Sequence, residues 1–437
     1  MNFILRFSAL QLFQLMRFMT TLVIGILLAK VFHLSTGEIA LYEMLLFLGS
    51  FFSFFWTSAG IKSLLSLYPK VGLASAELIF NLALLLLLLG IITGSILYFG
   101  QNWIVRHFTS FQRVDHIGLI SLILIASSPA ALTEYVYLLE KKESLLITYG
   151  LVTYGLQLSI LLTALYFQTG VEGIFKGLLL WSIIRLCWFL ILLSRTFLQS
   201  KQKKKRLRIS LKFQKMLLWL IFPLSLHMLV GGGMEYIDGF IVSGYFDEEG
   251  VFAVFRYGAR EFPLVLILTS ALTATLIPAA VLDQEGTAQN LKAETDRLSL
   301  MLYPASMVLM LLSSWLFPLV YNENFAASAP VFNIYLLVIS SRILLPQVFI
   351  YARQDNYVLV ISALAEVALN LVLSLYLVRD YGLEGIAFAT VIAYMINKLI
   401  LIAYTQFQLG VPVTAYVNVR RYLFFNALLM ACFLIQN

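Results

Sequence analysis

Charged residues are scarce in this sequence. Asp, Glu, Lys and Arg together make up 12% of its 437 residues, whereas hydrophobic residues make up 61%. A soluble globule cannot bury that much apolar surface, so the lipid bilayer must be the solvent for most of the chain. The scarcity of charge therefore indicates an integral membrane protein.

Cysteine and histidine are also rare, and familiar catalytic patterns are missing. Cys187 and Cys432 both fall in apolar segments, which argues against a disulfide framework or a thiolate metal site and leaves the redox compartment open. Of four histidines only His227 falls clearly inside an apolar run, where a packing role is the usual one. We find no Ser/His/Asp order, paired-cysteine spacing, P-loop or His-x-x-His pattern. We expect no enzymatic activity, no metal and no cofactor.

The apolar runs predict membrane-spanning helices. Most are about 20 residues long and lack the strict alternation of barrel strands. The first run carries Gln11, Gln14 and Arg17 and is too long for a signal-peptide core, so we interpret it as a retained helix. The twelve predicted spans are 8–32, 38–66, 75–99, 116–139, 144–168, 173–198, 213–244, 250–277, 298–320, 330–352, 356–379 and 384–408. A final apolar stretch, 422–435, either lies at the interface or forms a short thirteenth span.

The chain contains an internal repeat. The pattern Gly-x-Glu-Gly-Ile at residues 170–174 returns at 382–386, and at the same offset of 212 Lys141-Lys142-Glu143 falls on Arg353-Gln354-Asp355. Membrane proteins built from two similar halves are typically transporters that hold the substrate between the halves. We predict an N-terminal six-helix lobe at 1–199, a basic cytoplasmic linker at 200–212, a C-terminal six-helix lobe at 213–409 and a tail at 410–437.

Basic residues predict the orientation. With a cytoplasmic N-terminus, 18 basic residues lie in inside loops against four outside, namely Lys30, Arg106, Arg113 and Arg379. The basic run 201–208 fits a topology anchor and solvated linker better than a nucleic-acid patch, and anionic lipids account for the net charge of +7. The longest outside loop, about 100–115, leaves no room for a folded external domain.

Several basic residues fall inside the predicted spans, where each is costly unless it pairs or faces a cavity. Arg17, Arg185, Arg260 and Arg342 lie about ten to twelve residues from a span end and hence near the midplane at a rise of about 1.5 Å per residue. Lys398 lies deeper, toward the inner half.

The sequence predicts that spans seven and eight form an antiparallel hairpin with acidic residues on one helix and arginines on the other. It places Glu235 at the depth of Arg260 and Asp238 at the depth of Arg256. These groups form either two structural salt bridges or a switchable network in which an anion competes for the arginines or a cation for the carboxylates. The adjacent glycine triplet, Gly231, Gly232 and Gly233, indicates either a hinge or close helix packing.

Further carboxylates could balance the remaining charges. Glu366 and Glu134 are each candidate partners of Arg342 or Lys398, and the sequence does not choose between them. The six central basic residues are Arg17, Arg185, Arg256, Arg260, Arg342 and Lys398. If Glu235, Asp238, Glu261 and Glu366 offset four of them, a surplus of about two positive charges remains. A cavity of that sign favours phosphate or pyrophosphate over a cationic drug.

At this point the chain resembles the multidrug/oligosaccharidyl-lipid/polysaccharide exporter superfamily, and within it the bacterial polysaccharide flippases of the O-antigen type. The resemblance rests on the twelve-span plan, the repeated Gly-x-Glu-Gly-Ile, Tyr68-Pro69 ending the second span and Gly250 to Ala253 opening the eighth. It implies an all-α, V-shaped bundle of two six-helix lobes that alternates between inward and outward openings. It also implies a multi-pass protein of the bacterial cytoplasmic (inner) membrane.

The resemblance further implies a function in cell-surface polysaccharide and lipopolysaccharide biosynthesis. The expected substrate is undecaprenyl-pyrophosphate-linked oligosaccharide, moved from the cytoplasmic to the outer leaflet, with membrane lipids and polysaccharide-assembly proteins as further partners and no nucleic acid. Arg17, Arg256 and Arg260 correspond by span to cationic cavity residues of lipid-linked flippases. Drug-extruding relatives typically have a carboxylate in the first span, where this chain has Arg17 and no acid.

These observations yield one principal hypothesis and several alternatives. The candidate pyrophosphate ligands are Arg17, Arg256, Arg260 and Arg342. The candidate cation-coupling or charge network consists of Glu235, Asp238, Glu366 and Lys398. The candidate hinge is Gly231, Gly232 and Gly233. A cation-coupled multidrug antiporter is the main alternative. A polysaccharide polymerase or ligase is disfavoured by the lack of a large outside loop, and a purely structural membrane protein would not need so many midplane charges.

Overall fold

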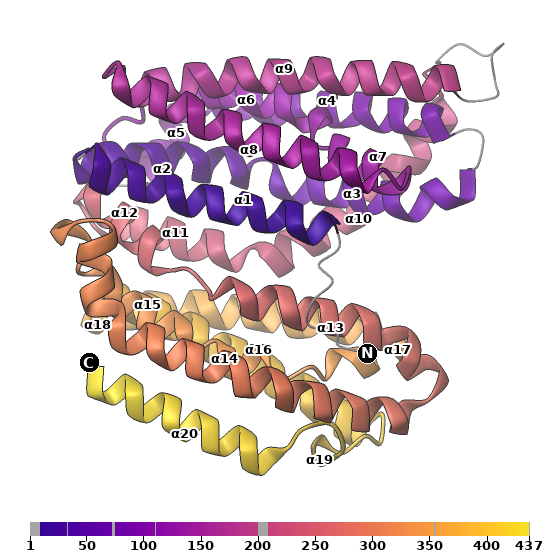
Figure 1. The fold of residues 1–437 in the computed structure, drawn as a ribbon, viewed down its shortest axis with the longest axis vertical. Helices are drawn as coiled ribbons and strands as arrows, with labels where there is room; N and C mark the ends of the chain where they lie inside the picture. The colour runs from indigo at the N-terminus through magenta and orange to yellow at the C-terminus, as the bar shows by residue number, and fades with distance from the viewer. Residues whose placement is uncertain are drawn as a thin grey trace. The chain divides into compact units, whose positions relative to one another are not determined.

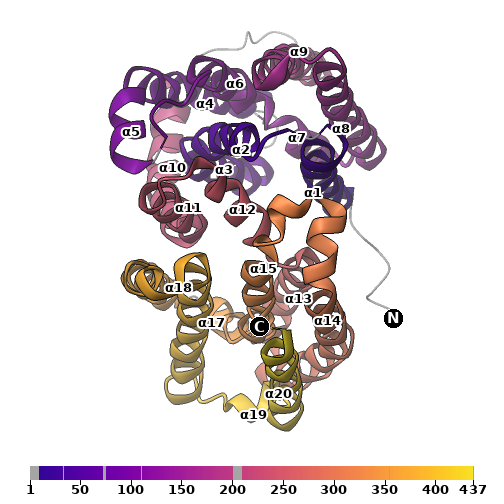
Figure 2. The same cartoon turned by 90° about the vertical axis from the view of Figure 1, so that its left-hand side faces the viewer.

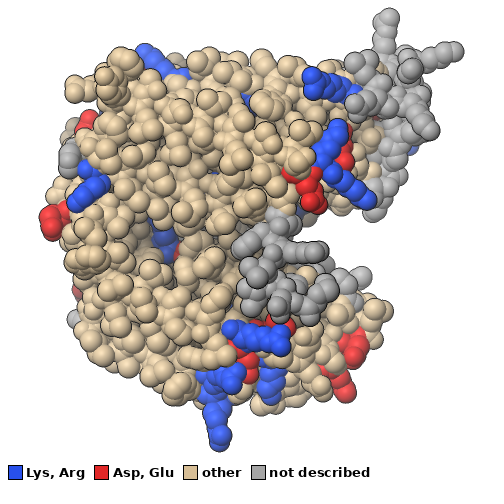
Figure 3. All heavy atoms as spheres, viewed as in Figure 1, with Lys and Arg blue, Asp and Glu red and all other residues tan. Residues whose placement is uncertain are grey.

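In the computed structural model the fold is described for residues 9–32, 34–71, 75–109, 111–199, 209–353 and 355–436. Every regular element within these ranges is a helix (Figure 1). On the face in Figure 3, charged side chains are sparse and broad uncharged surface separates them. Many large apolar side chains are exposed, among them Trp219 at 77% and Phe222 at 67%. This surface suits lipid, and the predicted all-α membrane class is confirmed.

The chain divides into two compact units, Met1–Gly232 and Gly233–Asn437. The first unit contains α1 (Ala9–Ile26), the π-helical η2 (Leu27–Val31), α2 (Thr36–Phe51), α3 (Phe54–Val71), α4 (Ser75–Phe99), α5 (Gln101–Phe108), α6 (Ile117–Ala130), α7 (Thr133–Leu139), α8 (Glu143–Tyr166), α9 (Gly170–Gln199) and α10 (Leu211–Gly232). Small residues let its helices approach closely: a Cβ on Gly94 of α4 would lie 3.1 Å from the Ser121 carbonyl oxygen of α6.

The second unit is built from the remaining helices. They are α11 (Met234–Tyr245), α12 (Glu249–Gly258), α13 (Pro263–Leu282), α14 (Gln284–Val320), η4 (Glu323–Phe325), α15 (Ser328–Leu336), α16 (Ile339–Arg342), α17 (Gln347–Arg353), α18 (Asn356–Phe407), α19 (Val413–Tyr416) and α20 (Val419–Gln436). The C-terminal α20 packs along α14 (Figure 2), where Phe425 stacks on Tyr303 at 5.2 Å between ring centroids.

One difference concerns the boundary between the halves. The sequence places residues 213–232 in the C-terminal lobe, whereas α10 belongs to the first unit because it packs on α3. Its start is also tied to α4, since Gln214 donates a hydrogen bond from Nε2 to the Asn81 carbonyl oxygen at 3.0 Å. The greater part of the predicted basic linker, residues 200–208, lies outside the described residues.

The long apolar helices cover the twelve predicted spans and the final apolar stretch, with α18 covering two of the spans and α20 the final stretch. Within the described residues ten helices are long and apolar enough to cross a membrane, or twelve if two bent pairs each count as one span. Helix α18 has 52 residues, which at a rise of about 1.5 Å per residue exceeds twice the hydrocarbon thickness. It is two spans joined at Gly382, as the sequence predicts. The 18 residues of α20 meet the same criteria of length and composition.

Five predicted spans are interrupted rather than continuous, and one of them is the seventh, which breaks at Gly233 between α10 and α11. The second span bends by 47° between α2 and α3, and the tenth bends by 48° between α16 and α17. The fourth breaks between α6 and α7, and the eighth between α12 and α13. The sequence predicts one helix for each of these spans, with a hinge or close packing only at the glycine triplet of the seventh, and for the other four spans this prediction is wrong. Proline explains three breaks, since Pro129, Pro263 and Pro346 lie at or beside them and cannot donate a helical N–H.

The repeated Gly-x-Glu-Gly-Ile element is a backbone turn. Its first glycine has φ of +65° at Gly170 and +56° at Gly382, a left-handed conformation that residues with a Cβ rarely adopt. A Cβ on Gly385 would also collide with the Leu377 carbonyl oxygen. The repeat therefore marks matching scaffold positions in the two units.

This turn gives a stability prediction. Gly382→Ala is expected to lower the free energy of unfolding by about 1–2 kcal/mol, because alanine is strained at positive φ. Thermal unfolding of the purified protein followed by tryptophan fluorescence would measure the loss. The control is Gly155→Ala, since Gly155 lies inside α8 and its added Cβ would meet no atom within 4 Å. Equal melting temperatures for the two variants would contradict the assignment.

Candidate functional site

Two of the broken spans are joined by an ion pair in the second unit. Arg342 is the last residue of α16, and Glu261 lies in the non-helical segment 259–262 between α12 and α13. The Arg342 guanidinium donates from Nε to Oε2 of Glu261 at 2.9 Å and from Nη2 to Oε1 at 2.6 Å. This bidentate geometry is the strongest form of a carboxylate–guanidinium contact. Because irregular backbone at membrane depth occurs where it is buried in protein or lines a cavity, the breaks indicate a functional region.

The twelfth span completes this cluster. Tyr394 of α18 lies beneath Arg342, with 4.1 Å from Cζ to the ring centroid, a cation–π contact. Lys398, one turn further along α18, donates from Nζ to Oε1 of Gln347 at 3.0 Å. Gln347 is the first residue of α17 after the break. The Lys398 contact thus ties α18 to the second half of the broken tenth span.

Glu366 belongs to the same group of charges. It lies in the first half of α18, interacts electrostatically with Arg342 and Lys398, and shares a side-chain hydrogen bond with Asn397. We call Glu261, Arg342, Glu366 and Lys398 the charged cluster. Its two acids and two bases balance, so an anion that bound there would have to displace a carboxylate.

Arg256 and Arg260 lie where α12 ends. Arg256 is in the last turn of the helix, and Arg260 follows it in the break. Arg260 donates from Nε to the Arg256 carbonyl oxygen at 3.3 Å, and its Cζ lies 5.1 Å from the ring centroid of Tyr257. Both arginines are half-buried. Arg260 directly precedes Glu261 in the chain, so the end of α12 brings positive charge next to the charged cluster.

A second polar group surrounds Asp238 of α11. Its side chain is 1% exposed, and Oδ2 accepts hydrogen bonds from Tyr335 at 3.0 Å and Thr390 at 2.6 Å. Asn370 donates from Nδ2 to the Thr390 hydroxyl at 3.0 Å. Within the described residues, Oδ1 of Asn370 and the hydroxyl of Ser374 one turn further on are buried and have no hydrogen-bond partner. Carboxylate, amide and hydroxyl oxygens gathered in this way are ligands that hard cations prefer.

The first unit has a buried charge pair of its own. Arg185 of α9 donates from Nε to the Tyr149 hydroxyl at 2.9 Å, and its Nη2 lies 4.0 Å from Oε2 of Glu134. Glu134 is in the first turn of α7, after the break in the fourth span. The sequence offered Arg342 or Lys398 as partners of Glu134, whereas the partner found in the structure is Arg185 of the same unit.

The predicted site residues therefore divide among several places. Arg342, Glu366 and Lys398 come together, Arg256 and Arg260 lie at the end of α12, and Asp238 belongs to a separate polar group. Arg17 is exposed on α1 in the first unit. The side chains of Glu235 and His227 lie outside the described residues, and Gly231 is the residue before the last of α10. The glycine triplet coincides with the end of α10 at Gly232, where an added Cβ would lie 2.8 Å from the Phe54 ring, so close packing accounts for that position.

Sequence reasoning missed the polar partners Gln347, Thr390, Tyr394 and Asn370. A signal for most of them exists, because Thr390, Tyr394 and Lys398 follow one another at intervals of four residues. Glu366, Asn370 and Ser374 do the same in the preceding span. Residues four apart share one face of a helix, so each span presents a single polar stripe.

The fold and the buried charges define a multi-pass membrane transporter of the flippase and exporter class. Residues 152–436, more than half of the chain, match the family model described as lipid II flippase MurJ, so the chain belongs to the MurJ family. No curated protein matches the chain. The expected exporter superfamily is confirmed, whereas the family found is that of lipid II flippases and the O-antigen subfamily is not supported.

Solved structures agree on the fold. The chain is similar to the lipid II flippase MurJ in an inward closed conformation, with 18% identity, a TM-score of 0.68, and coverage of 97% of this chain and 92% of that chain. An inward-facing multidrug resistance MATE transporter matches with 13% identity and a TM-score of 0.65, and the match covers 93% of this chain and 96% of the transporter. A transporter of the same exporter superfamily from Pyrococcus furiosus matches with 13% identity and a TM-score of 0.63, and the match covers 92% of this chain and 94% of that transporter.

Proposed function

We propose that the protein moves a polyprenyl-pyrophosphate-linked saccharide across the bacterial cytoplasmic membrane, from the inner to the outer leaflet, by alternating access. Lipid II is the favoured substrate, because the family model that matches is that of lipid II flippases. The N-terminus is proposed to be cytoplasmic, on the distribution of basic residues. The observation that supports an anionic substrate most directly is the pair of arginines, Arg256 and Arg260, at the end of α12.

Arg342 has a different role in this proposal from that of a preformed pyrophosphate ligand. Its Nε and Nη2 already hold Glu261, so a pyrophosphate could bind it only by competing with that carboxylate. Competition would separate the two broken helices and couple substrate binding to a change of shape. Such a ligand shifts a conformational equilibrium only by its difference in affinity for the two states.

The substrate assignment is tested with liposomes that contain the purified protein. Fluorescent lipid II is compared with a polyprenyl-pyrophosphate oligosaccharide that lacks the peptide, and the fraction accessible from outside is followed with time. We expect faster movement of lipid II. Equal rates for the two lipids would support the broader polysaccharide flippase, and no acceleration of either would reject both.

Asp238 is the proposed cation-coupling carboxylate. Asp238→Asn keeps the size of the side chain and removes its charge, so movement of the lipid should lose its dependence on an imposed sodium or proton gradient. Thr390→Ser retains a hydroxyl beside Oδ2 of Asp238 and should keep that dependence. The measurement is the rate in liposomes with and without the gradient. A gradient response that persists in Asp238→Asn would exclude this carboxylate.

A further inference from the structure

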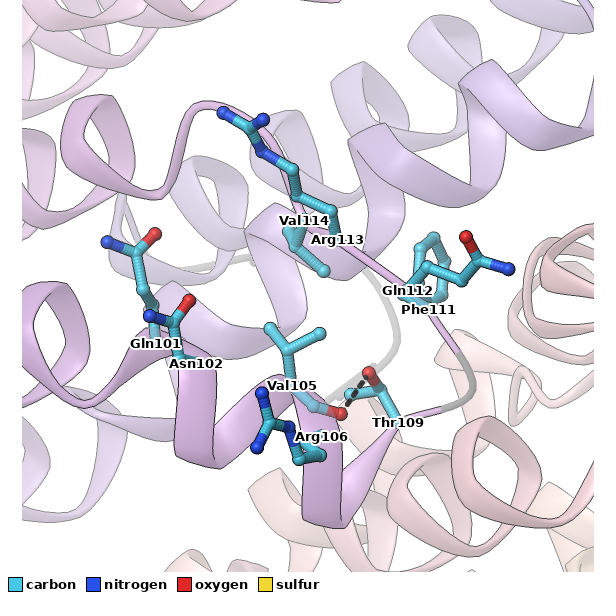
Figure 4. A pocket seen from close by; sticks show the side chains of 9 residues that line it. All are labelled: Gln101, Asn102, Val105, Arg106, Thr109, Phe111, Gln112, Arg113 and Val114. Atoms are coloured by element: carbon cyan, nitrogen blue, oxygen red, sulfur yellow. Dashed lines mark hydrogen bonds between the residues drawn. The ribbon is translucent and has the colours of Figure 1, made fainter.

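A polar pocket lies in the first unit, apart from the residues described above. Helix α5 and the non-helical segment 111–114 line an open pocket of about 520 Å³ (Figure 4). Val105 and Val114 form an apolar part of the lining and are 5% and 3% exposed, which fixes the helix and the segment to the rest of the unit. The pocket is thus part of the fold.

Polar side chains with unused hydrogen-bonding capacity line this pocket. They are Gln101, Asn102, Arg106 and Gln112. Within the described residues none of the three amides makes a hydrogen bond and Arg106 makes no ion pair. By contrast, Arg113 pairs with Asp115 at 2.7 Å. Arg106 therefore supplies a positive charge that has no ion-pair partner among the described residues.

Aromatic residues around α5 indicate its depth. Tyr98, Phe99 and Trp103 are 46%, 82% and 59% exposed, and Phe108 is 41% exposed. Exposed aromatic rings concentrate at the membrane–water interface, with their apolar parts toward lipid and their polar atoms toward water. Since α5 directly follows the long apolar α4, the pocket lies at the level of the lipid headgroups.

We propose that this pocket binds the phosphate of an anionic phospholipid headgroup. Arg106 contacts the phosphate through its planar guanidinium, and the amides of Gln101, Asn102 and Gln112 donate to and accept from the headgroup hydroxyls. An unneutralised arginine beside three free amides fits a phosphate bearing hydroxyl groups, as in phosphatidylglycerol, and does not fit a choline headgroup, whose ammonium would face the guanidinium. This site is independent of the flippase proposal.

Native mass spectrometry of the full protein tests the proposal, with phosphatidylglycerol and phosphatidylcholine titrated separately. We expect preferential binding of phosphatidylglycerol, and a loss of about tenfold or more in affinity in Arg106→Gln, because a charged hydrogen bond is removed. The matched control is Arg379→Gln, which removes an exposed arginine of α18 outside the pocket. A double variant, Gln101→Ala with Asn102→Ala, should weaken binding while leaving Arg106 in place.

Several outcomes would overturn the proposal. One is equal phosphatidylglycerol binding in the wild type and Arg106→Gln, and another is an equal loss in Arg379→Gln, which would show a general charge effect. If millimolar inorganic phosphate displaced phosphatidylglycerol as effectively as added phosphatidylglycerol does, the pocket would be a site for a free anion and not for a lipid. Equal binding of phosphatidylcholine would show that the headgroup charge is not recognised.

Discussion

Glu261→Ala is expected to destabilise the second unit strongly, by about 3–5 kcal/mol, because it leaves the buried guanidinium of Arg342 without its carboxylate. The Arg342 and Glu261 side chains are 24% and 16% exposed, so water compensates only in part. The loss would appear as a lower melting temperature of the purified protein. Arg342→Ala should act similarly, since it removes the other half of the pair and the cation above Tyr394.

The exposed pair of Glu172 and Lys176 provides the control. Its side chains are 49% and 64% exposed, and Glu172→Ala should change stability by less than about 1 kcal/mol. The exchange of Glu261→Arg with Arg342→Glu should recover part of the stability if the pair itself matters. Equal melting temperatures for Glu261→Ala and Glu172→Ala would show that the bidentate contact does not hold the broken spans together.

Arg256→Gln and Arg260→Gln are expected to reduce lipid transport severely, by about 10- to 100-fold each. In the proposed function each variant removes a charge-assisted contact to the substrate pyrophosphate, and such a contact contributes roughly 1.5–3 kcal/mol. The two lysine variants should retain intermediate activity, because a lysine preserves the charge but not the planar fork of donors. The rate of lipid movement in liposomes is the measurement, with protein content matched between samples.

The control for these variants is Arg353→Gln. Arg353 ends α17 and bonds through Nη2 to Oε1 of Gln284 at 3.1 Å in an exposed position, so its removal should leave transport unchanged. Full transport by a variant lacking both Arg256 and Arg260 would show that α12 does not hold the substrate. A loss in Arg353→Gln as large as theirs would point to general basic charge.

Much of the membrane fold is predictable from the sequence because the bilayer imposes both length and polarity on each span. The predicted pair 356–379 and 384–408 corresponds to the two halves of α18, which meet at Gly382. The breaks were missed because Pro129, Pro263 and Pro346 sit in segments apolar enough to read as continuous. Hydropathy reports whether a residue prefers lipid, and it is insensitive to a few non-helical residues.

The partners of the buried charges were harder to predict. Distance from a span end gives the depth of Arg342, but it does not give the rotation of the helix about its axis. The break at 259–262 also displaces Glu261 from the position that a continuous helix would give it. The correct partner was among the carboxylates considered for the charge balance, but the pairing itself requires the three-dimensional structure.

The repeat and the charges convey different information. Gly170 and Gly382 occupy equivalent turns, and breaks recur in the fourth and tenth spans at nearly the same offset. The charge pairs do not recur in the same way, since Glu134 and Arg185 lie 4.0 Å apart whereas Glu261 and Arg342 form a bidentate pair. The two units therefore share a scaffold and differ in the chemistry that it carries.

The most direct test of the central claim is the movement of lipid II across protein-containing liposomes. We expect the wild-type protein to accelerate this movement at least about tenfold over protein-free liposomes, a difference of roughly 1.4 kcal/mol in barrier height. The variant carrying both Arg256→Gln and Arg260→Gln should return the rate to the protein-free level. A wild-type rate equal to that of protein-free liposomes would contradict the proposed flippase function.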